Sequence, residues 1–427
     1  MSFTADRLLL FGATGDLAQR MLLPSLCALH DDKLIAPELT IIGTARSEYD
    51  DDTYQAFARV ALENYLPDFR KHAIDSFLPR LKYQVLDATQ ADHFTQLSDE
   101  IGQVEKGMAI FLSTAPSLFE PTIAGLTKAG LTGDKVRIGL EKPLGTSLET
   151  SREINDAVAA AFSEDRIFRI DHYLSKETVQ NHMLQLLALV AMEPPTSYEA
   201  TPIQDEKVKV LRALRVVAPT ETVTGQYRKG AIEGQPVPGY DEELGKPSDT
   251  ETFVAIKAHV DNWRWTGVPF YLRTGKRLPE RKTEIVVNFR CIPHSIFAAR
   301  GAKTQPNALV IGIQPEENIQ LQLMAKEPGL DRDGIRLRPV PLNITMPDAF
   351  AGPKKPIAYE RLLLDLIEGD QTLFVRRDEV EAQWGWIDQI RASWAEHEVK
   401  PKAYSAGNWG PSAAIALAER DGVTWHD

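Results

Sequence analysis

The chain has 427 residues, which is too many for one small core and favours two or three domains. Its net charge of −12 argues against nucleic acid as the main partner, because phosphate backbones select basic surfaces, but a small anionic ligand needs only a local basic cluster. The two cysteines, Cys27 and Cys291, give neither a metal-ligand spacing nor a disulfide framework. The sequence shows neither a signal-peptide pattern nor an apolar run long enough to cross a bilayer. We therefore expect a cytoplasmic protein without metal or membrane partners.

The first part of the chain alternates short apolar runs with amphipathic stretches. The expected strands are Arg7–Phe11, Leu39–Ala45, Lys82–Asp87, Met108–Ser113 and Val136–Leu140. The expected helices are Leu17–His30, Thr53–Tyr65, Asp92–Gly102, Leu118–Ala129 and Ser147–Phe162. Strands and helices that alternate at this spacing are typical of a doubly wound parallel sheet. We therefore expect a Rossmann-like dinucleotide-binding α/β domain over residues 1–165.

After residue 165 the pattern changes. A helix over Lys176–Ala191 should end before Pro194, and the glycine- and proline-rich stretch Gly230–Pro247 reads as loops. The expected strands that follow, without regular helices between them, are Phe253–Val260, Val268–Arg273, Thr283–Phe289, Ala308–Ile313 and Ile319–Met324; the last expected helices are Ala358–Glu368 and Glu379–Ala395. This pattern predicts an α+β substrate and dimerisation domain over residues 166–427 with a largely antiparallel sheet. An exposed sheet face would favour a homo-oligomer, either a dimer or a tetramer.

A glycine-rich turn follows the first expected strand. Gly12, Ala13, Thr14, Gly15, Asp16 and Leu17 lead into a helix start. A strand, a tight turn and a helix N-terminus in this order form an anion site, in which Gly12 permits the turn and Gly15 lets the backbone approach a pyrophosphate. Ala18 is small enough for the helix to pack closely on the strand. A plain strand–turn–helix that needs two glycines is the alternative.

The second expected strand ends at Arg46. This is where the ribose of a dinucleotide lies, and an arginine there suits the 2′-phosphate of NADP, whereas an acidic residue would bind the 2′-hydroxyl of NAD. A solvated surface arginine is the alternative, and Glu48 and Asp50 nearby leave NAD as the less favoured cofactor. Asp87 and Ala88, at the end of the third expected strand, are further candidates for cofactor binding.

Several segments together resemble the glucose-6-phosphate dehydrogenase family. They are Gly12–Leu17, Glu141–Gly145 (EKPLG), Arg169–Lys176 (RIDHYLSK), Val268–Arg277 (VPFYLRTGKR), Ala358–Leu362 (AYERL) and Phe374–Glu379 (FVRRDE). The RIDHYLSK and VPFYLRTGKR segments are specific to this family, whereas an EKP motif after a strand also fits other NAD(P)-dependent sugar oxidoreductases. The resemblance covers nearly the whole chain.

The local chemistry of these segments agrees with the resemblance. Lys142 follows an expected parallel strand at its carboxyl end, where ligands collect, although a surface lysine is the alternative. His172 and Lys176 are four residues apart and would share one face of a helix, so both could reach one phosphate. Lys276 and Arg281 lie in a densely basic stretch of an acidic protein.

The resemblance implies oxidation of glucose 6-phosphate by NADP to 6-phosphogluconolactone, in the pentose phosphate pathway. It implies that His182 is the general base and that Asp171 orients its ring, as a carboxylate does for a catalytic histidine. It assigns Lys142 to both substrate and cofactor. It also assigns the substrate to His172, Tyr173, Lys176, Lys276 and Arg281.

The sequence departs from the family at two places. Met21 stands where many members have a lysine that contacts substrate. In addition, the Val-Gln-Asn that follows RIDHYLSK runs directly into His182, whereas in the family several dozen residues separate that motif from the histidine. The chain thus resembles a member with an internal deletion after Asn181, which removes strands and acidic residues of the substrate domain.

This shortening bears directly on the expected chemistry. In one continuous helix, Asp171 and His182 would share a face but would be separated by about 16 Å of rise, whereas a hydrogen bond needs roughly 2.7–3.2 Å. We therefore expect the chain to bind NADP and to oxidise glucose 6-phosphate poorly or not at all. A non-catalytic NADP-binding member of the family and another NAD(P)-dependent sugar oxidoreductase are the alternatives.

Overall fold

The chain forms two packing units in a computed structural model that describes residues 4–102, 104, 106–142, 144–170, 179–294, 305–329, 336–345 and 359–426. Unit 1 comprises Met1–Glu221, Ile256–Leu272 and Pro356–Val399, and unit 2 comprises Thr222–Ala255, Arg273–Lys355 and Lys400–Asp427. Both units are built from segments that are discontinuous in sequence, whereas the sequence predicts a single boundary after residue 165. That boundary stays a prediction.

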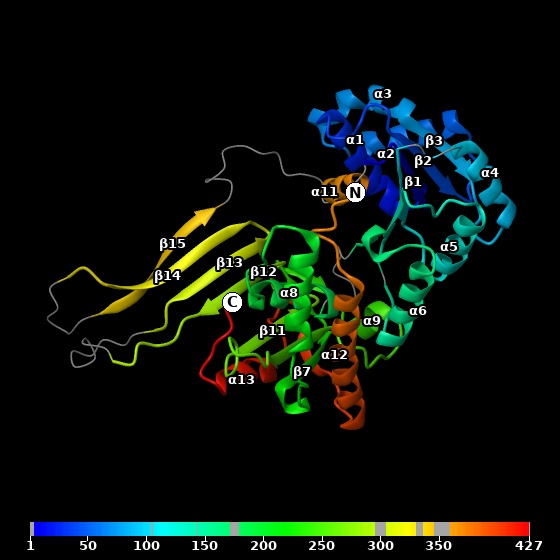
Figure 1. Ribbon diagram of the computed structural model, residues 1–427. Coiled ribbons are helices and arrows are strands. Elements are labelled where there is room, and N and C mark those ends of the chain that lie inside the picture. The colour runs from blue at the N-terminus through cyan, green and yellow to red at the C-terminus, as the bar shows by residue number, and fades with distance from the viewer. Residues whose placement is uncertain are drawn as a thin grey trace. The chain divides into compact units, whose positions relative to one another are not determined.

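Unit 1 contains a six-stranded parallel sheet in the order β3-β2-β1-β4-β5-β6 (Figure 1). Its strands are β1 Arg7–Phe11, β2 Thr40–Ala45, β3 Leu81–Val85, β4 Met108–Leu112, β5 Val136–Leu140 and β6 Ile167–Arg169. β1 pairs with β2 on one side and with β4 on the other. The strand order therefore reverses at β1, which is the point where open α/β sheets bind their ligands.

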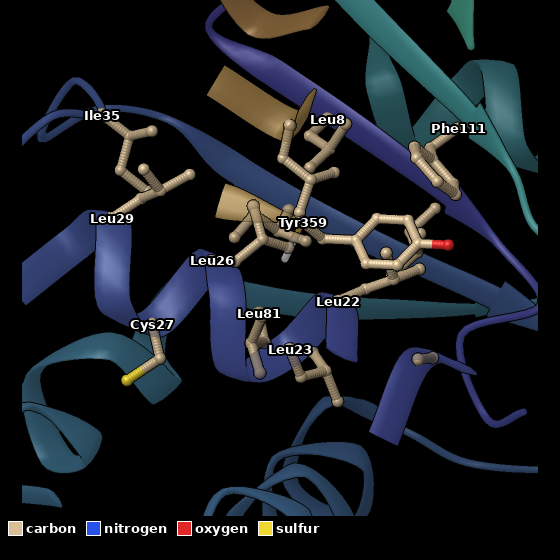
Figure 2. Packing of buried hydrophobic residues seen from close by; sticks show 14 of the residues in the cluster. Leu8, Leu22, Leu23, Leu26, Cys27, Leu29, Ile35, Leu81, Phe111 and Tyr359 are labelled. Atoms are coloured by element: carbon tan, nitrogen blue, oxygen red, sulfur yellow. The ribbon is translucent and has the colours of Figure 1, made fainter. Parts of the chain in front are cut away.

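Helices cover both faces of this sheet. They are α1 Leu23–Asp31, α2 Asp51–Tyr65, α3 Ile74–Phe77, α4 Ala91–Ile101, α5 Phe119–Lys128, α6 Leu148–Ala159 and α11 Glu360–Glu368. Along β1, Leu8 and Leu10 pack with α1, α2 and α11, whereas Leu9 and Phe11 pack with α4, α5 and the region after α6. Figure 2 shows the first of these cores, in which Leu22 just before α1, Leu26 of α1 and Tyr359 just before α11 lie around Leu8. A strand that is buried on both faces explains the unbroken apolar run of β1.

The described part of unit 1 contains three further α-helices. They are α7 Leu184–Ala191, α8 Ala200–Arg212 and α12 Arg377–Glu396, and α8 packs against both α7 and α12. A π-helical turn, Val179–Met183, leads directly into α7. Among the described residues, no helix is both long and apolar enough to cross a membrane.

Unit 2 is rich in antiparallel strands. The sheet β12-β13-β14-β15 consists of Thr283–Asn288, Ala308–Gln314, Asn318–Lys326 and Leu337–Thr345, each antiparallel to its neighbour. A second sheet has the order β11-β10-β7-β16, with β11 Pro269–Gly275, β10 Phe253–His259, β7 Thr222–Arg228 and β16 Lys402–Ser405. Strands β10 and β11 each have residues in both units. Unit 2 also contains the hairpin β8 Gly230–Ile232 with β9 Gln235–Val237 and the helices α9 Tyr240–Leu244 and α13 Ser412–Glu419.

The expected fold class is confirmed, with three local differences. The stretch Gly230–Pro247, expected as loops, contains the β8–β9 hairpin and α9. The hairpin forms because Gly234 takes a left-handed φ of 77° that closes its turn. Helices α3, α8 and α13 and strands β6, β7, β15 and β16 were not expected. The helix expected over Lys176–Ala191 is a π-helical turn followed by α7 in its described part.

Candidate active site

Functional candidates gather at the carboxyl ends of the parallel strands in unit 1. In register, Phe11 of β1 lies beside Thr44 of β2 and Leu112 of β4, so these strands end at one edge of the sheet. The glycine turn follows β1, Arg46 follows β2, Asp87 and Ala88 follow β3, and Lys142 follows β5. Parallel strands thus bring these residues to one edge, although they are far apart in sequence.

The turn after β1 requires glycine at its first position. Gly12 has a left-handed φ of 78°, and a methyl group there would lie 2.9 Å from both the main-chain oxygen and Oγ of Ser113. The Gly12 and Ala13 N–H groups donate to the Thr44 oxygen at 2.9 and 3.1 Å, which holds the turn against β2. Ala18 is fully buried where the following helix meets the sheet. The turn therefore has the tight backbone and the helix start that a pyrophosphate site needs.

Arg46 and Asp87 form the outer part of this edge. The Arg46 side chain is exposed immediately after β2. Thr89 donates to the Asp87 carboxylate through its N–H at 2.9 Å and its hydroxyl at 2.7 Å. These hydrogen bonds lower the pKa of Asp87 below its ordinary value, and the nearby charges of Arg46 and His93 lower it further. Asp87 is thus a carboxylate in an electropositive setting at the end of β3.

Glu141 and Lys142, which follow β5, are held in place by a tyrosine that comes much later in the chain. The Tyr359 hydroxyl donates to Glu141 Oε2 at 2.9 Å, and the Lys142 N–H donates to Glu141 Oε1 at 3.3 Å. Tyr359 is completely buried, and its ring makes an edge contact with Phe111 of β4 (Figure 2). Glu141 therefore links the main chain at Lys142 to the packed core.

Lys142 and His182 meet in unit 1. Lys142 Nζ lies 3.3 Å from His182 Nε2. An ammonium group has no acceptor, so a hydrogen bond between these atoms requires Lys142 to donate and His182 Nε2 to accept. The ring is then neutral with its proton on Nδ1. This is the tautomer in which Nε2 can take up a proton and in which Nδ1–H can donate to a carboxylate.

A small cavity lies beside this pair. It is lined by Lys142, Leu144, Gly145, Gln180, Asn181, Val375, Val380 and Trp384. Its volume of about 10 Å³ is close to what one water molecule requires. The pair is therefore packed against α12 and the residues before it.

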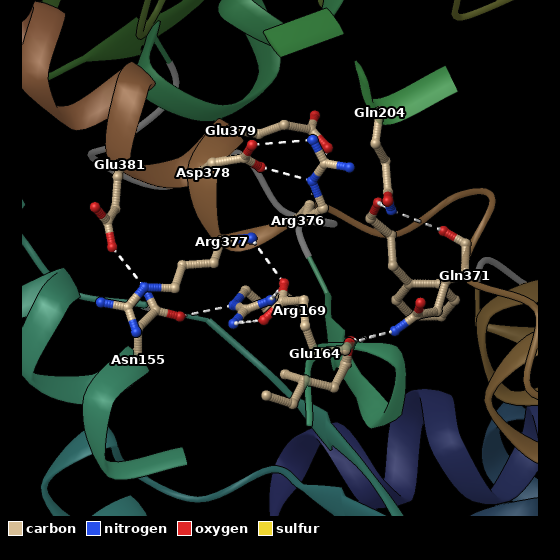
Figure 3. Close-up of polar contacts among 12 residues, drawn as sticks. Asn155, Glu164, Arg169, Gln204, Gln371, Arg376, Arg377, Asp378, Glu379 and Glu381 are labelled. Atoms are coloured by element: carbon tan, nitrogen blue, oxygen red, sulfur yellow. Dashed lines mark hydrogen bonds and ion pairs between the residues drawn. The ribbon is translucent and has the colours of Figure 1, made fainter. Parts of the chain in front are cut away.

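The strand that leads to the RIDHYLSK segment is anchored by a buried arginine. Arg169 makes two contacts to Glu164, at 2.6 and 3.0 Å, and its Nε donates to Asn155 Oδ1 at 2.7 Å (Figure 3). Glu164 also accepts from the Arg377 N–H at 2.9 Å. These contacts fix β6 to α6 and to the start of α12. The predicted residues Asp171, His172, Tyr173 and Lys176 lie outside the described residues.

The remaining two predicted residues, Lys276 and Arg281, belong to unit 2, and both are exposed. The Lys276 N–H donates to the Thr252 oxygen at 2.8 Å, and its own oxygen accepts from the Tyr404 hydroxyl at 2.6 Å. The main chain at Lys276 is therefore well fixed within unit 2.

Several supporting residues were not found from the sequence. Tyr359 belongs to the AYERL segment, but nothing in its local pattern indicates a hydrogen bond to Glu141, 218 residues earlier. Ser113, which fills the space beside Gly12, follows β4 without any motif. Contacts of this kind depend on sheet order, which local sequence does not encode.

These features are typical of one class of protein, in which an NAD(P)-binding oxidoreductase domain is joined to an α+β domain. They are the parallel sheet, the glycine turn at its switch point and the lysine–histidine pair beyond that turn. Residues 9–181 match the glucose-6-phosphate dehydrogenase NAD binding domain, and residues 173–426 match the glucose-6-phosphate dehydrogenase C-terminal domain. Together these matches span nearly the entire sequence, and the chain belongs to the glucose-6-phosphate dehydrogenase family.

Individual relatives agree with this assignment. The chain is 53% identical to glucose-6-phosphate 1-dehydrogenase of Zymomonas mobilis over 485 aligned positions, which cover 100% of both chains. It is 42% identical to the enzyme of the same name from Rhizobium meliloti, covering 98% of this chain and 96% of that one. Among solved structures, a glucose-6-phosphate dehydrogenase in complex with its substrate glucose 6-phosphate superimposes with a TM-score of 0.88 at 28% identity, over 100% of both chains. The enzyme from Mycobacterium avium superimposes with a TM-score of 0.84 at 31% identity, over 99% of each chain.

Proposed function

We propose that this chain oxidises glucose 6-phosphate at C1 to 6-phosphogluconolactone with NADP as the cofactor, and that the shortened substrate half slows the reaction strongly. The chemistry follows from membership of the family. The single observation that carries the proposal for this chain's own residues is the 3.3 Å contact between Lys142 Nζ and His182 Nε2 beyond the glycine turn.

His182 is the proposed general base. Oxidation of an alcohol to a lactone removes the hydroxyl proton together with a hydride from C1, and the bound nicotinamide accepts the hydride. A neutral His182 can take the hydroxyl proton at Nε2 when the substrate hydroxyl replaces Lys142 as the partner of that atom, and the imidazolium that forms then passes the proton to solvent. Lys142 next to Nε2 is placed to donate to the reacting oxygen. Asp171 is proposed to stabilise the imidazolium through Nδ1.

The residues at the sheet edge fit a dinucleotide. We propose that Gly12, Ala13, Thr14, Gly15, Asp16 and Leu17 hold the pyrophosphate and that Asp87, Ala88 and Lys142 line the rest of the cofactor site. The left-handed Gly12 without a side chain supports this, because any larger residue would fill the turn. The exposed Arg46 at the end of β2 supports NADP over NAD, since its guanidinium is available for a 2′-phosphate.

The sugar phosphate is proposed to bind through basic and hydroxyl side chains from two segments. His172, Tyr173 and Lys176 follow β6, whose position is fixed by the buried Arg169 contacts. Lys276 and Arg281 are the contributions from the stretch after β11. Cationic and hydroxyl groups of this kind form the charge-assisted contacts that a phosphate monoester prefers.

The low rate is proposed because we infer that a segment of the substrate half is missing after Asn181. The alignment with the Zymomonas mobilis relative extends over 485 positions, whereas this chain has 427 residues, so at least 58 positions of that relative have no counterpart here. The overlap of the two family matches at residues 173–181 also supports a junction in this region. The second candidate function is that of a protein that binds NADP without turnover, and the unmatched positions of the relative favour it as well.

A homo-oligomer is proposed from the exposed face of the β12–β15 sheet. Ile319 of β14 pairs directly with Ile344 of β15, so both lie on one face, and Val340 and Leu342 lie on the same strand as Ile344. All four are more than a third exposed. Apolar side chains gathered on a sheet face are typical of an interface, and light scattering coupled to size-exclusion chromatography would give the subunit number.

Calorimetric titration with NADP, followed by measurement of NADPH formation on addition of sugar, tests the proposed function. We expect saturable NADP binding and NADPH formation that requires glucose 6-phosphate and does not occur with unphosphorylated glucose. Binding of NADP without any NADPH would select the non-catalytic candidate. Failure to bind NADP, or equal rates with glucose, would contradict the proposal.

A further inference from the structure

Buried polar side chains hold the segment that carries His182 on its N-terminal side. His182 belongs to the π-helical turn Val179–Met183. Two residues before it, Gln180 Nε2 donates to Gln383 Oε1 of α12 at 2.8 Å. Gln180 and Gln383 are 3% and 0% exposed, so this hydrogen bond is shielded from water. It ties the turn directly to α12.

Contacts to a buried ion pair hold the segment on its C-terminal side. Three residues after His182, Gln185 Oε1 accepts from Lys207 Nζ of α8 at 3.2 Å, and Gln185 Nε2 donates to Glu379 Oε2 of α12 at 3.4 Å. Lys207 and Glu379 themselves form an ion pair at 2.7 Å, with side chains that are 6% and 0% exposed. Gln185 therefore bridges both members of a buried ion pair.

The Glu379 carboxylate has its own fixed orientation. Its other oxygen, Oε1, accepts from the Arg376 N–H at 3.1 Å at the start of α12, the region that Figure 3 shows. A buried charged pair is costly to rearrange, because removing one contact leaves a charge without compensation. The hydrogen bonds are also directional, so they fix the rotation of the turn about its axis, which apolar packing fixes less strictly.

We propose that Gln180 and Gln185 are positioning residues, which hold His182 Nε2 at Lys142 Nζ by anchoring the turn to α8 and α12. This inference rests on the proposed function, in which His182 is the base and Lys142 donates to the reacting oxygen. Gln180 and Gln185 touch neither Lys142 nor His182 in any contact described above. Gln180 acts through the main chain of the turn itself, and Gln185 acts through the start of α7, which follows the turn directly.

The test measures the coupling between Lys142 and His182 without substrate. The protein carries ¹³C,¹⁵N-histidine, His182 is identified among the nine histidines by the signal lost in His182→Gln, and its ring is titrated by NMR. In the parent, Lys142→Met should raise the His182 titration midpoint by about one pH unit, because a cation beside the ring disfavours the imidazolium. In a Gln185→Met background, the same Lys142→Met change should produce less than half of that shift. Gln180→Met should act in the same way from the other side of His182.

The matched control is Gln204→Met. Gln204 is also a buried glutamine of unit 1, but its Nε2 donates to the Phe374 and Gln371 oxygens at 3.1 and 3.4 Å rather than to the turn. The full Lys142-dependent shift should survive in this variant. Every other charged group near the turn, including Glu141, Lys207 and Glu379, is unchanged in all the variants.

Three results would overturn the inference. They are an undiminished shift in both Gln180→Met and Gln185→Met, an equal loss in Gln204→Met, and the absence of a Lys142-dependent shift in the parent. Use of two independent variants keeps the test decisive if one of them does not fold, as judged by thermal unfolding. Because the readout requires neither NADP nor sugar, a lack of NADPH formation would count against the proposed function and not against this positioning role.

Discussion

Arg46 is the residue on which the choice of cofactor depends. Its side chain is exposed where β2 ends, and its charge is felt by Asp87 at the end of β3. Loss of a charge-assisted contact to a 2′-phosphate costs roughly 1.5–3 kcal/mol, which is about tenfold to a hundredfold in affinity. Arg46→Ala should weaken NADP binding by this factor and leave NAD binding nearly unchanged, as measured by calorimetric titration.

A control in the same sheet domain separates local from general effects. Arg59→Ala removes another exposed arginine, which lies on α2 and pairs with Asp75 of α3 at 2.7 Å. This change should alter the binding affinity of neither NADP nor NAD. Equal losses of NADP and NAD affinity in Arg46→Ala would remove Arg46 from the 2′-phosphate site.

Tyr359 is a residue whose single oxygen supports the EKP segment. Tyr359→Phe keeps the buried ring and removes the hydrogen bond to Glu141. Because the acceptor is a buried carboxylate, we expect the free energy of unfolding to fall by roughly 1.5–3 kcal/mol in urea denaturation at neutral pH. Tyr198→Phe is the control, since Tyr198 is 83% exposed, and it should change stability little. Similar stabilities for Tyr359→Phe and the parent would show that the hydroxyl does not support Glu141.

At the scale of an element, the turn between β1 and its helix makes a prediction of its own. Gly12→Ala combines a left-handed backbone with a contact of 2.9 Å to Ser113. Gly130→Ala has a similar φ of 74° but would meet nothing within 4 Å, so it isolates the backbone strain, which is about 1–2 kcal/mol. Gly12→Ala should cost more than Gly130→Ala and should also weaken NADP binding, whereas Gly130→Ala should not. If the two variants bind NADP equally well, the tight turn is not part of the cofactor site.

Elements were predictable where the local pattern is strong. Unbroken apolar runs such as Leu8–Phe11 gave strands to within a residue or two, because a strand buried on both faces has no polar positions. Strand β6 has only three residues and was missed for that reason. In β15, Pro339 and Pro341 interrupt the expected pattern, yet the strand forms because it pairs only with β14 and lies at the sheet edge.

The candidate site was predictable only in part. Residues with a recognisable neighbourhood, such as Gly12 or Lys142, were found from the sequence and the family resemblance. The contact between Lys142 and His182 spans 40 residues, and the buried Gln180–Gln383 pair spans 203. Such contacts arise from how helices pack in three dimensions, so no local hydrophobic periodicity or motif predicts them.

At the scale of the whole molecule, we infer that the chain combines a complete cofactor-binding sheet with a shortened substrate half. The glycine turn, Arg46 and Lys142 all precede the proposed junction at Asn181, so cofactor binding should be unaffected by the missing segment. Substrate positioning should suffer, because a misplacement of about 1 Å can lower a rate roughly a hundredfold.

The most direct test compares steady-state NADPH formation from glucose 6-phosphate by this chain and by the Zymomonas mobilis relative under the same saturating conditions, with NADP affinity measured alongside. We expect NADP affinities within about tenfold of each other and a turnover rate for this chain that is lower by a hundredfold or more. Equal turnover rates would contradict the account and would show that the missing segment is dispensable for the reaction.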